Sequence, residues 1–153
     1  MAETPAAEAL NELLEKVADA LGLDAEISVE DDGELVRGRL GGEDLGLFIG
    51  RHGQTIDAVQ HIAMRVVATA AGERRLVEVD AEGYRERRAE ALRGQADGAA
   101  DEALRFGRPV ALDAMGASER KLVHEYLRDR GDVQTYSEGD EPHRHLVVAA
   151  LRS

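Results

Sequence analysis

Hydrophobic residues recur at helical spacing near the start of the chain and then give way to strict alternation. Between residues 6 and 21 the apolar side chains stand three or four positions apart, after Thr4 and Pro5, which are typical of a helix start. Apolar and polar residues then alternate over residues 25–30 and 34–40, on either side of a turn-forming Asp-Asp-Gly. The pattern predicts a helix with an acidic outer face, followed by a β-hairpin.

The periodicity changes again in the next forty or so positions. A short helical turn is predicted over residues 43–48, and a longer helix over residues 56–70, with either Ile62 or Ala63 in its buried stripe. Residues 75–80 return to alternation, which indicates a strand. The predicted order is therefore helix, strand, strand, short helix, glycine loop, helix, strand.

The second half of the chain contains a different set of elements. Residues 84–106 are rich in Arg, Glu and Ala and are helical in propensity, although Gly94 and Gly98 interrupt the pattern. Beyond them the pattern predicts a strand, a helix, a strand, a turn and a terminal strand, at residues 109–112, 118–129, 133–136, 137–140 and 145–151. The mixture of helices and strands in both halves predicts the α+β fold class.

A length of 153 residues suits one ordinary domain or two small ones. We predict two modules, residues 1–81 and residues 107–153, joined by a helical connector at residues 82–106. The sequence contains no cysteine, which excludes disulfides and thiolate metal sites. Neither a signal peptide nor an apolar run of about 18 residues is visible, so a cytoplasmic protein without membrane insertion is expected.

The charge of the chain is unevenly distributed. A formal net charge of −12 argues against a nucleic-acid ligand, but residues 1–35 carry eleven acidic residues against Lys16 alone, so the remainder is nearly neutral. Of the 19 basic residues, 17 are arginine, whose planar group suits phosphate and base stacking. The charge therefore weakens the case for nucleic acid without removing it.

The short and long helices are separated by Gly50-Arg51-His52-Gly53, directly after Ile49. Glycines at a helix start let the backbone approach a ligand closely, while free N–H groups and the positive dipole end favour an anion. Arg51 and His52 would then project as phosphate donors. The loop indicates a phosphate site, although a Gly-x-x-G spacing alone is also typical of an ordinary turn between helices.

With its preceding isoleucine, this loop resembles the Ile-Gly-x-x-Gly signature of the KH domain, which clamps about four nucleotides of a single strand. The predicted order of elements over residues 1–81 is similar to the type II, prokaryotic form of that domain. The resemblance implies a single-stranded nucleic acid as ligand. The residues that it implies in RNA binding are Ile49, Gly50, Arg51, His52 and Gly53.

A second basic feature lies on the helix predicted over residues 118–129, for which Ser118 is the expected N-cap. Arg120, His124 and Arg128 recur at every fourth position and form a basic stripe beside the apolar arc of the helix. The stripe alone is also typical of a solvated helix surface.

Residues 107–151 resemble the R-3-H domain, which is named for an arginine and a histidine separated by three residues. Arg120 and His124 carry this resemblance, together with the Thr-Tyr-Ser-Glu-Gly sequence after the helix. It implies that the stripe binds a single-stranded nucleic acid, and it adds Arg144, expected on the last strand, as an RNA-binding residue. Ala114 departs from the proline expected before the methionine.

A KH domain followed by an R-3-H domain resembles the bacterial Jag, or KhpB, family. Longer members have an additional N-terminal Jag domain, so this chain is expected to be a short form in which only an acidic helix precedes the first strands. The resemblance implies a single-stranded RNA-binding protein, with single-stranded DNA as an alternative ligand. It further implies post-transcriptional regulation or RNA chaperone activity linked to cell envelope growth and division, and a small KH-domain protein as partner.

Another class of function stays open, a protein-interaction adaptor that has lost nucleic-acid binding and docks a basic partner on its acidic N-terminal helix. Catalysis is not expected, because the sequence has neither a Walker lysine after a glycine loop nor a Gly-x-Ser-x-Gly elbow. His143 and His145 share one face of a predicted strand but have no visible third ligand. We therefore expect no cofactor and no metal.

Overall fold

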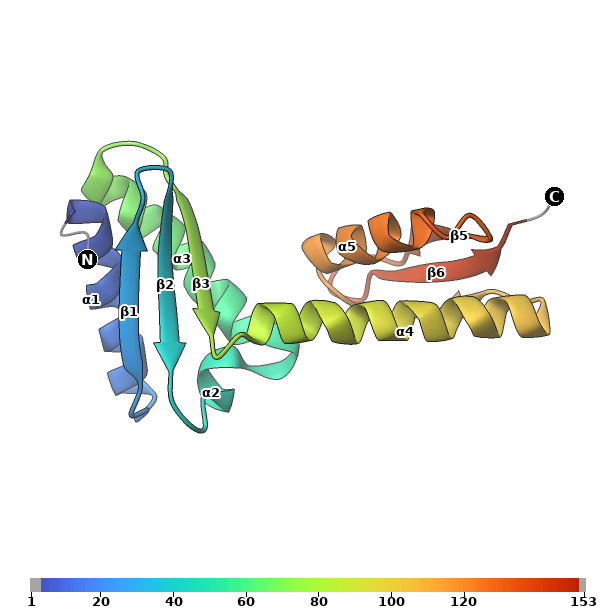
Figure 1. Cartoon of the computed structure of the whole chain (residues 1–153), viewed down its shortest axis with the longest axis horizontal. Helices are drawn as coiled ribbons and strands as arrows, with labels where there is room; N and C mark the ends of the chain where they lie inside the picture. Colours follow the sequence, from blue (N-terminus) through green and yellow to red (C-terminus); the bar gives the residue numbers. More distant parts are fainter. Residues whose placement is uncertain (1–3, 152–153) are drawn as a thin grey trace. The chain divides into compact units, whose positions relative to one another are not determined.

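The structure is a computed structural model that describes residues 4–151, and it divides near Arg85 into two compact units (Figure 1). The elements of the first unit are α1 (Pro5–Ala20), β1 (Glu26–Asp31), β2 (Leu35–Gly41), α2 (Gly46–Ile49), the 3-10 helix η1 (Arg51–Gly53), α3 (Gln54–Ala71) and β3 (Leu76–Ala81). Those that follow are α4 (Tyr84–Phe106), β4 (Val110–Ala111), α5 (Ala117–Arg128), β5 (Val133–Glu138) and β6 (His145–Ala150). The predicted order and the α+β class are confirmed.

The first unit is a three-stranded sheet with helices on one face. Its strand order is β1-β2-β3, with β1 antiparallel and β3 parallel to β2. Val36, Gly38 and Leu40 point into the core, as their alternation predicts. Leu10 of α1 and Ile56 of α3 belong to the same buried cluster, and Figure 1 shows both helices on the same side of the sheet.

The buried stripe of α3 differs in part from the sequence expectation. Ile56, Val59, Ala63 and Val67 are buried, whereas Ile62 is 51% exposed. At about 100° per residue, position 63 falls on the same side as positions 56, 59 and 67, and position 62 falls well to one side of it. Ala63 is therefore the core residue, and Ile62 contributes an apolar surface.

Asp31 ties three segments of the first unit together. Its carboxylate accepts a hydrogen bond from Thr4 Oγ1 at 2.7 Å and another from the main-chain N–H of Gly33 at 2.9 Å. It also forms an ion pair with Arg75, which precedes β3. These donors lower the pKa of Asp31 to about 2, with the Arg75 hydrogen bond as the largest cause. The side chain is only 3% exposed, so solvent screens these contacts little.

This pKa shift predicts a specific loss of stability in acid. Because the folded-state pKa lies below the ordinary value of 3.8, the ionised carboxylate stabilises the first unit above that value and ceases to do so as pH falls towards 2. The loss is on the order of 2 kcal/mol. In urea titrations from pH 5 to pH 2, we expect Asp31→Asn to flatten the fall in stability. An equally steep fall in the variant would contradict this role.

The second unit has a three-stranded sheet in the order β4-β6-β5, with both pairs antiparallel. α4 continues through Gly94 and Gly98 without a break. One of its faces packs into the second core together with residues of α5, of the segment before α5 and of the sheet: Leu92, Ala96, Ala99, Ala100, Met115, Val123, Leu127, Val133, Leu146 and Val148. The helix predicted as a connector, α4, therefore contributes side chains to the core of the second unit.

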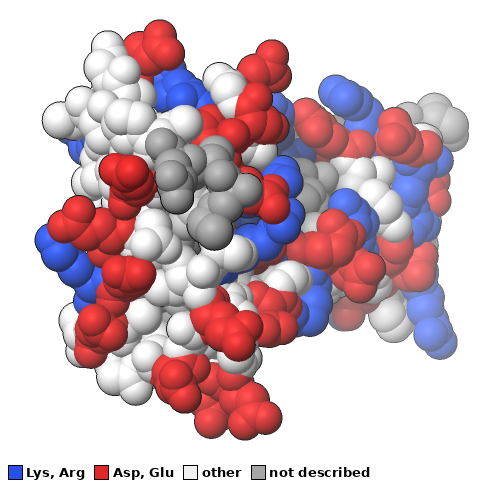
Figure 2. Space-filling model, turned by 60° about the vertical axis from the view of Figure 1, so that its left-hand side comes forward, with Lys and Arg blue, Asp and Glu red and all other residues white. Residues whose placement is uncertain are grey.

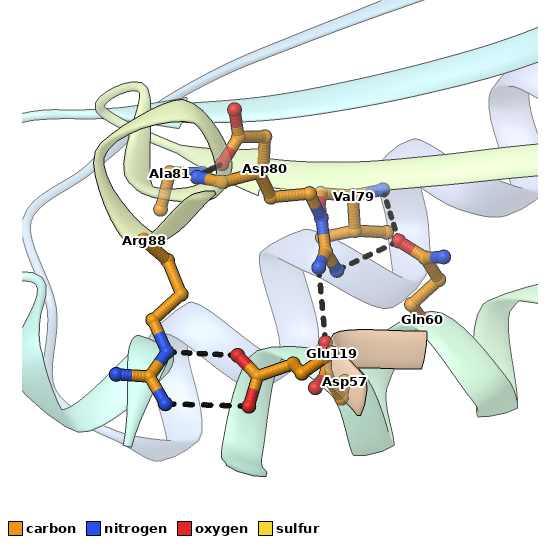
Figure 3. A network of polar contacts seen from close by, with 8 residues as sticks. Asp57, Gln60, Val79, Asp80, Ala81, Arg88 and Glu119 are labelled. Atoms are coloured by element: carbon orange, nitrogen blue, oxygen red, sulfur yellow. Dashed lines mark hydrogen bonds and ion pairs between the residues drawn. The ribbon is translucent and has the colours of Figure 1, made fainter. Parts of the chain in front are cut away.

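Polar contacts also attach α4 to the rest of the second unit. Arg88 and Glu119 form a two-point pair at 2.7 and 3.3 Å, which Figure 3 shows, and both side chains are less than a fifth exposed. Arg130 binds Asp97 and Asp101 of α4 at 3.2 and 3.0 Å.

None of the helices between residues 4 and 151 has the length and apolar composition needed to cross a membrane.

Candidate nucleic-acid interface

The glycine loop requires glycine at both of its ends. Gly50 has φ 76° and ψ 176°, and a Cβ there would lie 2.8 Å from the main-chain N of Thr55. Gly53 has φ 79°, and a Cβ there would lie 2.7 Å from Oη of Tyr84. Both values of φ are in the region that side chains rarely adopt. Ile49, just before the loop, is partly buried against the core and holds this end of α2 in place.

Between these glycines, the loop presents Arg51 and His52 to solvent. The backbone of His52 is in the left-handed region, with φ 55° and ψ 26°, so the loop turns sharply before α3 begins at Gln54. No side chain caps the N-terminus of this 18-residue helix. The N–H of Gln54 donates to Arg51 O, but the next N–H groups of the first turn and the positive end of the dipole face the same place as an arginine and a histidine, an arrangement that favours a phosphate.

A pocket of about 480 Å³ lies further along α3, beside the start of β3. It is lined by His61, Met64, Arg65, Ala68, Arg74, Arg75 and Leu76. Leu76 is 68% exposed and Met64 is 40% exposed, which leaves apolar surface beside cationic groups. Such a lining suits a ligand that combines flat apolar rings with negative charge. At about 1.5 Å per residue, His61 lies about 12 Å along the helix from the glycine loop.

This pocket was not among the sites predicted from the sequence. A signal was present in the strand pattern at residues 75–80, where Leu76 falls on the same face as Glu78 and Asp80. A single exposed leucine is common on protein surfaces, so this signal becomes informative only together with Met64, which the fold brings beside it.

Side chains cover the outer edge of β3 at its centre. Gln60 Oε1 accepts a hydrogen bond from Val79 N–H at 2.9 Å, and Arg85 Nε donates to Val79 O at 2.8 Å. Arg85 also donates to Gln60 and to Asp57, at 2.8 and 3.0 Å, and Figure 3 shows Asp57, Gln60 and Val79 in this network. This point of the edge is therefore closed to pairing with another strand.

An acidic depression of the first unit shares no lining residue with the α3–β3 pocket. This depression, of about 690 Å³, is lined in part by five acidic residues: Asp24, Glu26, Glu43, Asp44 and Glu82. The side of this unit that is turned forward in Figure 2 also carries many Asp and Glu side chains. Phosphate would be repelled there, so the electrostatics favour the surface of the glycine loop and the α3–β3 pocket.

In the second unit, the structure separates the members of the basic stripe. His124 and Arg128 are exposed on α5, and His124 Nδ1 contacts the hydroxyl of Thr135 on β5. Arg120 is only 11% exposed and forms an ion pair with Glu141. The stripe therefore offers two accessible groups and one that is already occupied.

Two local expectations for this unit are wrong in detail. α5 begins at Ala117 with Gly116 as its N-cap, so Ser118 lies inside the first turn and does not cap the helix. Arg144 precedes β6 and does not belong to it, and its guanidinium donates to the main-chain oxygen of Gly139 at 2.7 Å. This contact closes the β5–β6 loop.

Within residues 4–151, no three or more His, Cys, Asp or Glu side chains are grouped to hold a metal ion.

Comparison with known proteins gives two domain matches. A family model described as the KhpA/KhpB KH domain matches residues 7–79, and one described as the R-3-H domain matches residues 90–150. The second match begins inside α4.

Similar whole chains come from several bacteria. The protein described as RNA-binding protein KhpB in Clostridium symbiosum is 37% identical over 143 residues, which is 92% of this chain and 64% of the relative. The protein of the same name in Lactiplantibacillus plantarum is 37% identical over 148 residues, which is 97% of this chain and 46% of the relative. The protein of the same name in Bacillus subtilis is 33% identical over 141 residues, which is 91% of this chain and 68% of the relative. The chain thus spans between about half and two thirds of the length of these relatives.

Proposed function

The chain belongs to the KhpB family, with a KH domain followed by an R-3-H domain, and from this premise we propose that it binds single-stranded RNA without catalysing a reaction. The relatives it resembles are described as RNA-binding proteins. The observation that carries the proposal is the glycine loop, where two required glycines place Arg51 and His52 at the uncapped start of a long helix.

The α3–β3 pocket supports a path for the strand beyond the glycine loop. A KH domain holds about four nucleotides, and the bases must leave water when their phosphates are clamped. Met64 and Leu76 offer apolar surface for those bases, while Arg65 lies beside them in the same pocket. We infer that the strand runs from the loop along α3, away from the acidic depression.

The R-3-H unit would add contacts of its own. His124 and Arg128 are exposed at positions that follow one another along α5, and their cationic groups can reach phosphates. Aromatic side chains are scarce, with Tyr136 on β5 45% exposed, so base stacking would depend more on arginine planes and apolar surface than on an aromatic platform.

The finer role follows the family resemblance. We propose that the protein acts in the cytoplasm as a post-transcriptional regulator or RNA chaperone linked to cell envelope growth and division, with a small KH-domain protein as partner. The adaptor alternative would use the acidic outer face of α1, which stays exposed at Glu8, Glu12 and Glu15 while Leu10 and Leu14 pack into the core.

Fluorescence anisotropy with a random single-stranded RNA, at several salt concentrations, tests the proposal. We expect saturable binding whose affinity falls with salt as if about two to five phosphates were neutralised, a logarithmic slope between about −1.4 and −3.5. A slope equivalent to eight or more phosphates would contradict the proposed surface, since it would require many more cations than the loop, pocket and stripe supply. No saturable binding would favour the protein-interaction adaptor.

A further inference from the structure

Arg120 is held between two loops of the second unit. Its guanidinium donates a hydrogen bond to the main-chain oxygen of Met115, in the segment before α5, and pairs with Glu141 of the β5–β6 loop at 3.0 Å. Its side chain is 11% exposed, whereas that of Glu141 is 62% exposed. The arginine is thus the covered member of the pair.

Other contacts connect the same segments. The N–H of Met115 donates to the main-chain oxygen of Arg144 at 3.2 Å, and Arg144 in turn donates to Gly139 O within the β5–β6 loop. Apart from these, the loop from residue 139 to residue 144 is largely exposed. We call Arg120, Glu141 and Met115 the loop clamp. Because the loop buries so little surface, its conformation depends on this clamp together with two bonds inside the loop, from Arg144 to Gly139 O and from His143 N–H to Asp140 O.

We propose that Arg120 is a positioning residue that acts through Glu141 and fixes the β5–β6 loop beside α5, and that RNA is contacted by His124, Arg128 and the loop and not by Arg120. This inference rests on the proposed RNA binding. His124 is one helical turn beyond Arg120 and contacts Thr135 on the strand that leads into the loop, so the clamp aligns the loop with the exposed part of the stripe.

The charges of the pair support this role. An arginine that contacts phosphate contributes an uncompensated positive charge, but Arg120 lies against a carboxylate that cancels most of its field. Releasing it for a phosphate would break the ion pair and the bond to the Met115 carbonyl together. The covered guanidinium would then lose two hydrogen-bond partners at once, which costs free energy that the phosphate contact would have to offset.

Removing Glu141 distinguishes a direct RNA contact by Arg120 from a positioning role, because the two roles predict changes in RNA affinity of opposite sign. If Arg120 contacted RNA, Glu141→Ala would free its charge and remove a negative one, and affinity would rise. If the clamp positions the loop, the same change loosens it and RNA affinity falls by about threefold to tenfold, because the loop must be ordered on binding. The matched control is Glu138→Ala, which removes an exposed carboxylate at the end of β5 and should leave affinity unchanged or slightly raised.

The slope of RNA affinity against salt reports the number of phosphate contacts, and a purely structural role of Arg120 would not change it. Arg120→Lys keeps the charge but cannot bridge two groups in the same way, so we expect the affinity to fall with an unchanged slope against salt. Arg128→Ala, in contrast, should lower the magnitude of the slope by about 0.7, as expected for one phosphate contact to a single strand. Hydrogen exchange of the loop amides in the absence of RNA should be faster in Glu141→Ala and Arg120→Lys and unchanged in Glu138→Ala.

The outcomes are distinguishable. Weaker binding by Glu141→Ala, together with faster exchange in the loop, supports the clamp. Equal or tighter binding by this variant, or unchanged loop exchange, overturns it even when the unaltered protein binds RNA normally. A reduced salt slope in Arg120→Lys would place Arg120 on a phosphate and overturn it as well. Failure of the unaltered protein to bind RNA overturns the proposed function, and the inference falls with it.

Discussion

Replacing both Arg51 and His52 by Asp is expected to lower the affinity for single-stranded RNA at least tenfold, or about 1.4 kcal/mol, without changing the fold. Both side chains are exposed in the glycine loop, so neither packs against the core. The substitution removes a cation from the uncapped start of α3 and sets two carboxylates against the phosphate. An anion there is attracted by the free N–H groups, but two fixed negative charges would compete for them.

The backbone of the loop should tolerate this change. His52 has φ 55°, and Asp is one of the few residues that adopt the left-handed region at low cost. Gly50 and Gly53, whose replacement would bring a Cβ against Thr55 or Tyr84, remain in place. The circular dichroism spectrum and the melting temperature should therefore match those of the unaltered protein.

A control with the same change in formal charge separates local from general repulsion. Lys16→Glu with Gln95→Glu adds as much negative charge at exposed positions on α1 and α4. Neither position belongs to the glycine loop or lines the α3–β3 pocket, and exposed charges are screened over a Debye length of about 8 Å at physiological salt, so we expect this variant to bind within about twofold of the unaltered protein. Equal losses in the two variants would remove the glycine loop from the proposed site, as would no loss in either.

Leu14→Ala should destabilise the first unit by about 2 to 5 kcal/mol, the usual cost of emptying a leucine site in a core. Leu14 is 0% exposed and packs above Gly38 of β2, where an added Cβ would lie 2.6 Å from its Cδ1 atom. The helix and the strand approach closely at this point because the strand has no side chain there. The surroundings therefore have little freedom to collapse into the cavity.

Hydrogen exchange measured residue by residue suits this test, since two units need not unfold together. Amides of β2 and α3 should lose protection in Leu14→Ala, whereas those of β6 should keep it. The matched control is Leu47→Ala, the same chemical change at a side chain that is 64% exposed, which should cost less than about 0.5 kcal/mol. Unchanged protection in Leu14→Ala would contradict the role of Leu14 in holding α1 on the sheet.

Much of the fold could be predicted because its signals lie in consecutive residues. Thr4 and Pro5 start α1 as predicted, with the Thr4 side chain accepting a hydrogen bond from the main-chain N–H of Ala7. The Asp-Asp-Gly turn joins β1 to β2, and the glycine loop stands between two helices. A cap, a turn and a loop each depend on the conformations of a few neighbouring residues, which a single sequence displays directly.

Predictions were weaker where distant segments decide the outcome. The sequence left Ile62 and Ala63 open as the core residue because the larger apolar side chain stands directly before the smaller one, and the packing of α3 shows that Ala63 is buried while Ile62 is 51% exposed. The Arg/Glu/Ala-rich α4 offered no clear apolar stripe in the sequence. Its small buried face, which is largely alanine, became recognisable only against α5 and the second sheet.

The sequence by itself therefore determined the order of elements, the two glycines of the loop and the presence of Arg51 and His52 between them. The tertiary structure decided which charged groups are accessible. Arg120 and Arg128 occupy equivalent positions on one helical stripe, yet Glu141 and the Met115 carbonyl bind the first, while the second is exposed. Helical spacing determines the direction of a side chain, but its partners come from segments that only folding brings near, because an isolated helix has no loop beside it.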